Sequence, residues 1–177
     1  IQVVGVDDFS SGKKDYLEKA VKNKNFHLIN FSDEKIKIDL PRLDYLIVVS
    51  EGGWNLTSLL HLVKDLKPKI VFVSSIDLYN RKIDFSLRWF KEAEINLAKF
   101  ADEHHLNARV VRLSAVYGPR MHFRLEDPVV RLIQANLLGE LQKELVALEF
   151  SSRALYVDDA IELVIKSMLS GATAWRI

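Results

Sequence analysis

The stretch VVGVDDFSSGKK, from Val3 to Lys14, places two acids, two serines and two lysines directly after an apolar run. In an α/β protein, this succession is typical of a strand end that holds a nucleotide. The same residues also suit a strand that ends and a helix that is then capped, because Asp and Ser are good capping residues. The stretch alone gives these two interpretations equal weight.

The chain alternates between runs that predict strands and runs that predict helices. Short, β-branched or continuous apolar runs predict strands, and apolar residues at helical spacing predict helices. The strands cover residues 1–6, 25–30, 44–50, 69–75 and 108–114, with shorter ones at 154–159 and 173–177. The helices cover residues 13–22, 55–67, 86–105, 127–138 and 160–169; the last is capped by Asp158 or Asp159 and stopped by Gly171.

This order predicts an α/β fold with a parallel sheet covered by helices on both faces, because the strands are apolar on both sides. Ligands of such sheets bind beyond the carboxyl ends of the strands. We therefore expect a site among the loops 7–13, 50–55, 74–79 and 114–120.

Composition removes several classes of function. The chain has 177 residues, 49% of them hydrophobic, and a formal net charge of +1, so we expect one domain and neither a nucleic-acid nor a membrane partner. Cysteine is absent, which excludes disulfides, thiolate metal sites and cysteine catalysis. A reducing, cytoplasmic compartment is the default expectation. The five histidines form no His-x-x-x-His pair, so we expect no metal site.

Five segments, in order, carry a resemblance to a known family. They are VVGVDDFSSGKKDYLEK, WNLTSLLHLV, IVFVSSIDLY, ARVVRLSAVYGPR and ALYVDDAIELVIKSML. Together they resemble the extended short-chain dehydrogenase/reductases, specifically the NAD-dependent nucleotide-sugar epimerase/dehydratase family. The resemblance implies one Rossmann-like domain over residues 1–177 that lacks the family's first strand and Gly-rich turn. Residues 115–157 would contribute a small substrate-side region.

The resemblance also implies ligands and site residues. Asp7 falls where the family uses an acid to bind the adenosine ribose of NAD. The implied cofactor-binding residues are Asp7, Asp8, Ser10, Ser11, Lys13 and Asn55, and the implied substrate-binding residues are Tyr117, Arg120 and Arg153. Ser75 takes the family's catalytic Ser/Thr position. Without the Gly-rich turn, we expect NAD binding to be weak or lost. A nucleotide or nucleotide sugar is the expected ligand.

The catalytic pair of that family is missing. The family uses a Tyr with a Lys four residues later, whose ammonium lowers the pKa of the phenol. The matching helix places Ser86 at the Tyr position and Phe90 at the Lys position, and Lys91 is one residue off. In addition, Ala115 stands where the family has a substrate-contacting Asn. A degenerate, non-catalytic member is therefore the favoured interpretation. An active enzyme seen as a fragment and a structural or regulatory subunit remain as alternatives.

The sequence also raises the question of association. The apolar run headed by Ile1 and Val3 resembles a strand that pairs with the family's first strand, so it predicts an open edge. In this family, the helix that matches residues 86–105 often packs in a dimer face. A homodimer or a partner protein is thus expected, with Trp89 and Phe100 as anchors. The alternative is that both aromatics are buried in the protein's own core.

Overall fold

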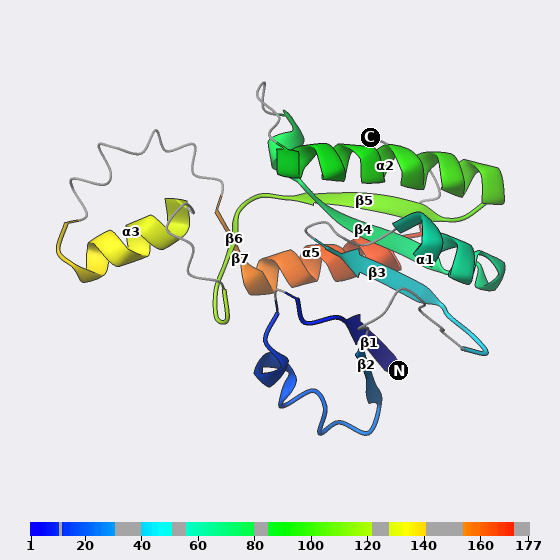
Figure 1. Ribbon diagram of the computed structural model, residues 1–177, viewed down its shortest axis with the longest axis horizontal. Coiled ribbons are helices and arrows are strands. Elements are labelled where there is room, and N and C mark those ends of the chain that lie inside the picture. Colours follow the sequence, from blue (N-terminus) through cyan, green and yellow to red (C-terminus); the bar gives the residue numbers. More distant parts are fainter. Residues whose placement is uncertain are drawn as a thin grey trace. The chain divides into compact units, whose positions relative to one another are not determined.

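The computed structural model describes residues 1–10, 12–30, 40–50, 56–79, 85–121, 128–140 and 154–171. It forms two compact units, Ile1–Asp39 and Leu40–Ile177 (Figure 1). Each unit is described by itself. The single-domain organisation expected from the sequence stays a prediction, as does the substrate-side region at 115–157.

The first unit is built on two parallel strands, β1 (Val3–Asp7) and β2 (Phe26–Asn30), with Val3 opposite Phe26. Between these strands, the sequence predicts a helix over residues 13–22, and this prediction is wrong. A 3₁₀ helix, η1, covers only Lys14–Leu17, and turns follow it. Val21, part of the apolar stripe that predicted this helix, is 48% exposed. Most helical stability in proteins comes from burying such a stripe, so a stripe left half in solvent supports only a short turn.

The second unit is built on a parallel sheet of three strands in the order β3–β4–β5. These strands are β3 (Tyr45–Val49), β4 (Lys69–Ser75) and β5 (Ala108–Leu113). Right-handed crossovers through helices connect parallel neighbours in such sheets. Here α1 (Leu56–Val63), with a 3₁₀ turn η2 (Lys64–Leu66), joins β3 to β4, and η3 (Ile76–Tyr79) and α2 (Phe85–His104) join β4 to β5.

Helices cover both faces of this sheet (Figure 1). Phe72 of β4 contacts Trp89 and Phe90, which places α2 on one face. On the other face lies α5 (Val157–Leu169), where Arg109 of β5 donates a hydrogen bond to the carbonyl of Ser170. Between the layers lies a core whose largest fully buried members include Leu60, Ile70, Phe72 and Leu97. The two-sided parallel sheet predicted from the sequence is thus confirmed.

Shorter elements follow β5. A two-residue strand, β6 (Val116–Tyr117), pairs in parallel with β7 (Leu155–Tyr156), and α3 (Pro128–Leu137) lies between them in the chain. The expected cap of α5 is wrong: Tyr156 is the N-cap residue, and Asp158 and Asp159 lie inside the first turn. In the first turn, their negative charges interact favourably with the positive end of the helix dipole. The strand expected at 173–177 lies outside the described residues.

The end of α2 follows a helix-stop motif that the sequence did not signal with glycine. His105 has a left-handed backbone with φ of 53°. The Leu106 amide donates to the carbonyl of Ala101 at 2.9 Å, and the His105 amide donates to that of Asp102. This is a Schellman arrangement, which normally uses Gly at the left-handed position. Burial of Leu106, which is 7% exposed, secures it.

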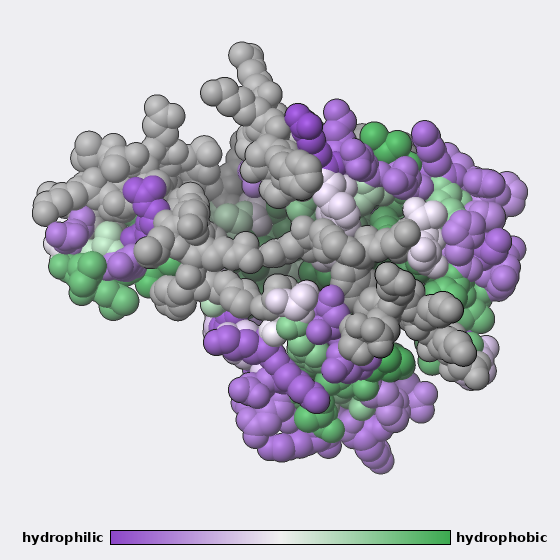
Figure 2. Space-filling model, in the orientation of Figure 1, coloured by the Kyte–Doolittle hydropathy of each residue, from purple (hydrophilic) through white to green (hydrophobic). Residues whose placement is uncertain are grey.

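The two aromatics that were expected as dimer anchors, Trp89 and Phe100, are both residues of α2. Phe100 is 7% exposed and packs against His61 of α1 and His104. Trp89 is half-buried against Phe72 and Phe90. The surface over α2 is mainly hydrophilic (Figure 2). Phe100 therefore belongs to the core of its own unit, as the alternative interpretation held, and association stays a prediction.

Candidate functional site

The carboxyl ends of β4 and β5 carry polar side chains on adjacent strands. Ser74 is paired in register with Arg112, and Ser75 with Leu113. Because side chains alternate along a strand, Ser74 shares the face of Phe72, toward α2, and Ser75 takes the opposite face. This edge is where parallel sheets bind ligands, and the site expected in the loop 74–79 stays a prediction.

Ser75, the residue expected at the catalytic Ser/Thr position, is held in a tight local turn. Its Oγ accepts a hydrogen bond from the Asp77 amide at 3.1 Å and donates one to the Asp77 carboxylate at 3.2 Å. Such turns are common for Ser at the start of a loop. Ser75 is half-buried at this carboxyl end of the sheet, which we call the ligand edge. A ligand that accepted a hydrogen bond from its hydroxyl would compete with the Asp77 carboxylate.

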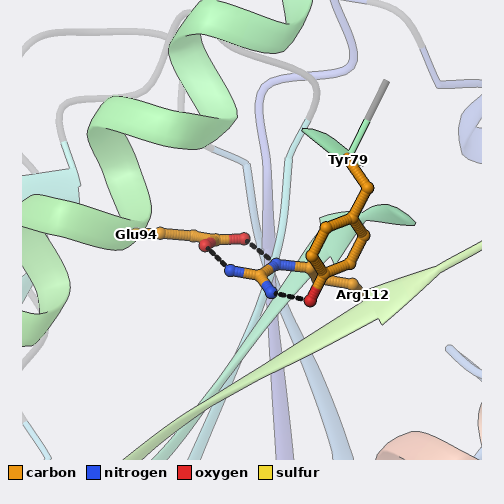
Figure 3. Close-up of polar contacts among 3 residues, drawn as sticks. All are labelled: Tyr79, Glu94 and Arg112. Carbon is orange, nitrogen blue, oxygen red and sulfur yellow. Dashed lines mark hydrogen bonds and ion pairs between the residues drawn. The ribbon is translucent and has the colours of Figure 1, made fainter. Parts of the chain in front are cut away.

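A buried ion pair lies under this edge (Figure 3). Arg112 of β5 donates from Nε to Oε1 of Glu94 at 2.9 Å and from Nη2 to Oε2 at 2.5 Å. The side chains are 17% and 9% exposed. The hydrogen bonds that Arg112 donates to Glu94 raise the pKa of the Arg112 guanidinium, and burial opposes them only in part. Two parallel bonds fix the guanidinium plane as well as its position.

Tyr79 completes the cluster in Figure 3, although the residue is 70% exposed. Its hydroxyl accepts a hydrogen bond from Arg112 Nη1 at 2.5 Å, and the guanidinium carbon lies 5.0 Å from the ring centroid. Beside this cluster, Ser74 is 4% exposed, and its Oγ has no hydrogen-bond partner among the described residues. A chain of bonds from α2 through β5 therefore holds an exposed phenol at the ligand edge.

The start of α2 is packed with aromatics at the position where the family that the sequence resembles has its catalytic lysine. The Phe90 ring lies 6.3 Å from that of Phe72 and 5.1 Å from that of Trp89. Lys91 is exposed. The side chain of Ser86 lies outside the described residues. Position 90 therefore contributes to packing between α2 and β4, and it supplies no ammonium to a neighbouring phenol.

In the first unit, the acids after β1 form local turns. Asp7 Oδ1 accepts the Phe9 amide at 2.7 Å, and Phe9 has a φ of 56°. Asp8 Oδ1 accepts the amide of Ser10 at 2.9 Å and its hydroxyl at 2.7 Å. These bonds from Ser10 lower the pKa of Asp8. Both acids are exposed and both accept hydrogen bonds within the turn, which fits the turn interpretation and the ligand interpretation equally.

The remaining predicted residues are placed as follows. Lys13 is exposed just before η1. Tyr117 is half-buried, with its ring 5.5 Å from that of Tyr156, and Arg120 is exposed with a φ of 71°. Ser11, Asn55 and Arg153 lie outside the described residues. Within the described part of the chain, no three His, Asp or Glu side chains gather as a metal site would require.

Comparison with known proteins connects this geometry to a fold. No family model matches the sequence, and no curated protein does. Solved structures do match. UDP-glucuronic acid 4-epimerase from Bacillus cereus, in complex with NAD, aligns with a TM-score of 0.74 and 19% identity over 97% of this chain and 67% of its own. The chain has its fold. The fold expected from the resemblance to the extended short-chain dehydrogenase/reductases is confirmed.

Two further structures share this epimerase/dehydratase fold. UDP-N-acetylglucosamine 4-epimerase from Methanobrevibacter ruminantium M1 aligns with a TM-score of 0.70 and 19% identity, over 97% of this chain and 66% of its own. dTDP-glucose 4,6-dehydratase from Bacillus anthracis aligns with a TM-score of 0.72 and 13% identity, over 97% and 64%. The chain thus spans about two thirds of the length of these epimerases and dehydratases. No helix among the described residues is long and apolar enough to cross a membrane.

The ion pair between Arg112 and Glu94 was not predicted from the sequence. The sequence pointed to Ser75 through the segment IVFVSSIDLY, which Tyr79 ends, but not to the ion pair of Glu94 and Arg112. Glu94 was one of many charges on a long amphipathic helix, and Arg112 interrupted an apolar strand. A charged residue at an inward position of a predicted buried strand is the signal that was available, because such a charge needs a buried partner.

Proposed function

We propose that this protein binds a nucleotide sugar and does not carry out Tyr-Lys hydride-transfer catalysis. The observation that carries the proposal is the packing of Phe90 on Phe72 and Trp89 at the start of α2. An aromatic side chain there cannot lower the pKa of a phenol as an ammonium does. The solved structures that share the fold support the ligand class, because one is a complex with UDP-glucuronic acid and NAD and another is a complex with UDP-N-acetylmuramic acid.

NAD is expected to bind weakly or not at all. Asp7 and Asp8 supply carboxylates for ribose hydroxyls, but each already accepts amide hydrogen bonds within its own turn. A pyrophosphate needs several backbone amides or cations. The expected order of affinity is therefore UDP-sugar above NAD.

A second candidate function is that of a structural or regulatory subunit. One face of β3 favours it: Tyr45, Ile47 and Val49 alternate along the strand and are 40%, 43% and 73% exposed. Apolar side chains gathered on one face often mark an interaction surface. A homodimer or a complex with another protein would cover them.

Calorimetric titration of the purified protein with UDP-glucuronic acid, UDP and NAD tests the first function. We expect binding of UDP-glucuronic acid, weaker or undetectable binding of NAD, and no epimerised product after incubation with both. Epimerisation that Ser75→Ala abolished would overturn the non-catalytic part of the proposal. A protein that binds none of the three ligands would overturn the ligand class and favour the subunit function, which light scattering tests directly.

A further inference from the structure

We propose that Tyr79 is a ligand-stacking residue, on which a ring of the bound nucleotide sugar rests, and that Arg112 and Glu94 are the residues that position it. The inference depends on the proposed function, because it assigns a role within that same site. It starts from the combination of high exposure and tight anchoring at one side chain. Tyr79 is 70% exposed, yet its hydroxyl is bound 2.5 Å from Arg112 Nη1.

The anchoring is stiff because each partner is itself fixed. Arg112 is held by two bonds to Glu94, and Glu94 is 8% exposed within α2. The guanidinium therefore has little freedom to follow a moving phenol. An exposed aromatic ring that is already ordered loses little conformational entropy on binding, which is the main cost of using a flexible side chain.

The location suits a ligand. Tyr79 ends η3, directly beyond the carboxyl end of β4, where ligands of parallel sheets bind. Ser75 lies at the same strand end, and the neighbouring Ser74 Oγ is buried without a partner among the described residues. A nucleotide sugar offers two rings with a weakly polar face, the base and the pyranose, and either stacks on a phenol.

Three variants of Tyr79 and one control test this in calorimetric titrations with UDP-glucuronic acid. Tyr79→Leu removes the ring and should weaken binding about threefold to tenfold. Tyr79→Phe keeps the ring but loses the bond to Arg112, so its affinity should fall between those of the wild type and Tyr79→Leu. Tyr79→Trp also keeps an aromatic ring and loses that bond, because an indole cannot accept a hydrogen bond from Arg112, so its affinity should fall in the same range as that of Tyr79→Phe. Tyr45→Leu is the control, because Tyr45 also lies near a cation, Lys69, but begins β3 at the opposite end of the sheet.

The two ring sources are separated by repeating the titrations with UDP. If Tyr79→Leu lowers the affinity for both ligands, the ring that stacks on Tyr79 is the base. If it lowers the affinity for UDP-glucuronic acid alone, the stacked ring is the sugar. Equal affinity of the wild type and Tyr79→Leu for UDP-glucuronic acid would overturn the stacking role while leaving the proposed function intact. A wild type that binds neither ligand would overturn both. Equal affinity of Tyr79→Phe and the wild type would overturn the positioning role of Arg112 and Glu94.

Discussion

Arg112 of β5 and Glu94 of α2 form a two-pronged ion pair, with Nε–Oε1 and Nη2–Oε2 distances of 2.9 and 2.5 Å, between the sheet and the helix that covers it. Both side chains are largely buried. Because water has little access to either group, each buried charge is stabilised mainly by the other. The pair therefore ties the geometry of the ligand edge to the packing of α2.

Removing one member of this pair should be costly. Glu94→Gln leaves the Arg112 guanidinium without its counter-charge, and we expect the free energy of unfolding to fall by about 3 kcal/mol. Urea denaturation measures this fall. Replacing both members, with Glu94→Leu and Arg112→Met, should recover much of the loss. Lys22→Met, which breaks an exposed pair with Glu18, should change stability by under about 1 kcal/mol. A Glu94→Gln protein as stable as the wild type would contradict the prediction.

Position 90 should not accept a lysine. Phe90→Lys places an ammonium against the rings of Phe72 and Trp89, and desolvation of the charge should lower stability by about 2 kcal/mol. Lys91→Ala, at an exposed neighbouring position, should stay within about 0.5 kcal/mol of the wild type. Thermal unfolding of the two variants side by side checks this. Equal melting temperatures would show that the aromatic packing around position 90 is loose.

Gly118 is required by both its backbone and its surroundings. Its φ is 150°, and a Cβ there would lie 2.6 Å from Val157 Cγ1. Gly118→Ala should therefore cost more than about 2 kcal/mol, from strain and overlap together. Gly139→Ala isolates strain, because Gly139 has a φ of 73° and open space around it, and should cost about 1 kcal/mol. Gly171→Ala, with neither problem, should be nearly neutral. The same loss in all three variants would refute this ordering.

The Asp8–Ser10 turn should be visible in a titration. Ser10 donates from its amide and its hydroxyl and lowers the pKa of Asp8, so Ser10→Ala should raise that pKa toward the ordinary value. Because the folded-state pKa is depressed, the stabilising contribution is present above the unfolded-state pKa and is lost as the pH falls through the folded-state one, below about pH 4. Carboxyl NMR measures both proteins. Glu162, whose pKa is lowered by Lys166, should be unchanged and serves as the internal reference.

The elements that could be predicted from the sequence are those whose apolar residues follow a regular spacing and are buried in the structure. The strand expected at 69–75 is found as Lys69–Ser75, and the helix expected at 86–105 is found as Phe85–His104. Both carry apolar residues that are buried in the core, among them Ile70, Phe72 and Leu97. The helix expected at 13–22 failed because its stripe, including Val21, is not buried, and nothing in the sequence of the stripe itself tells whether a partner surface exists.

The site was harder to predict than the fold. Ser75 and Tyr79 lie in one segment, IVFVSSIDLY, and from this segment the sequence predicts a role for Ser75 alone. Glu94 and Arg112 lie 18 residues apart on different elements, and only the crossing of α2 over β5 brings them together. A side-chain pair of this kind depends on tertiary packing, so periodicity and composition carry no direct trace of it.

The central position of β4 also determines how the second unit opens. This strand has a partner on each edge and helices on both faces, and Ile70, Val71 and Phe72 are at most 1% exposed. Local fluctuations can free an edge strand or a helix end, but we expect the amides of these three residues to be exposed only when the whole unit unfolds. Their exchange with deuterium should therefore be the slowest in the unit, and its rate should report the global free energy of unfolding.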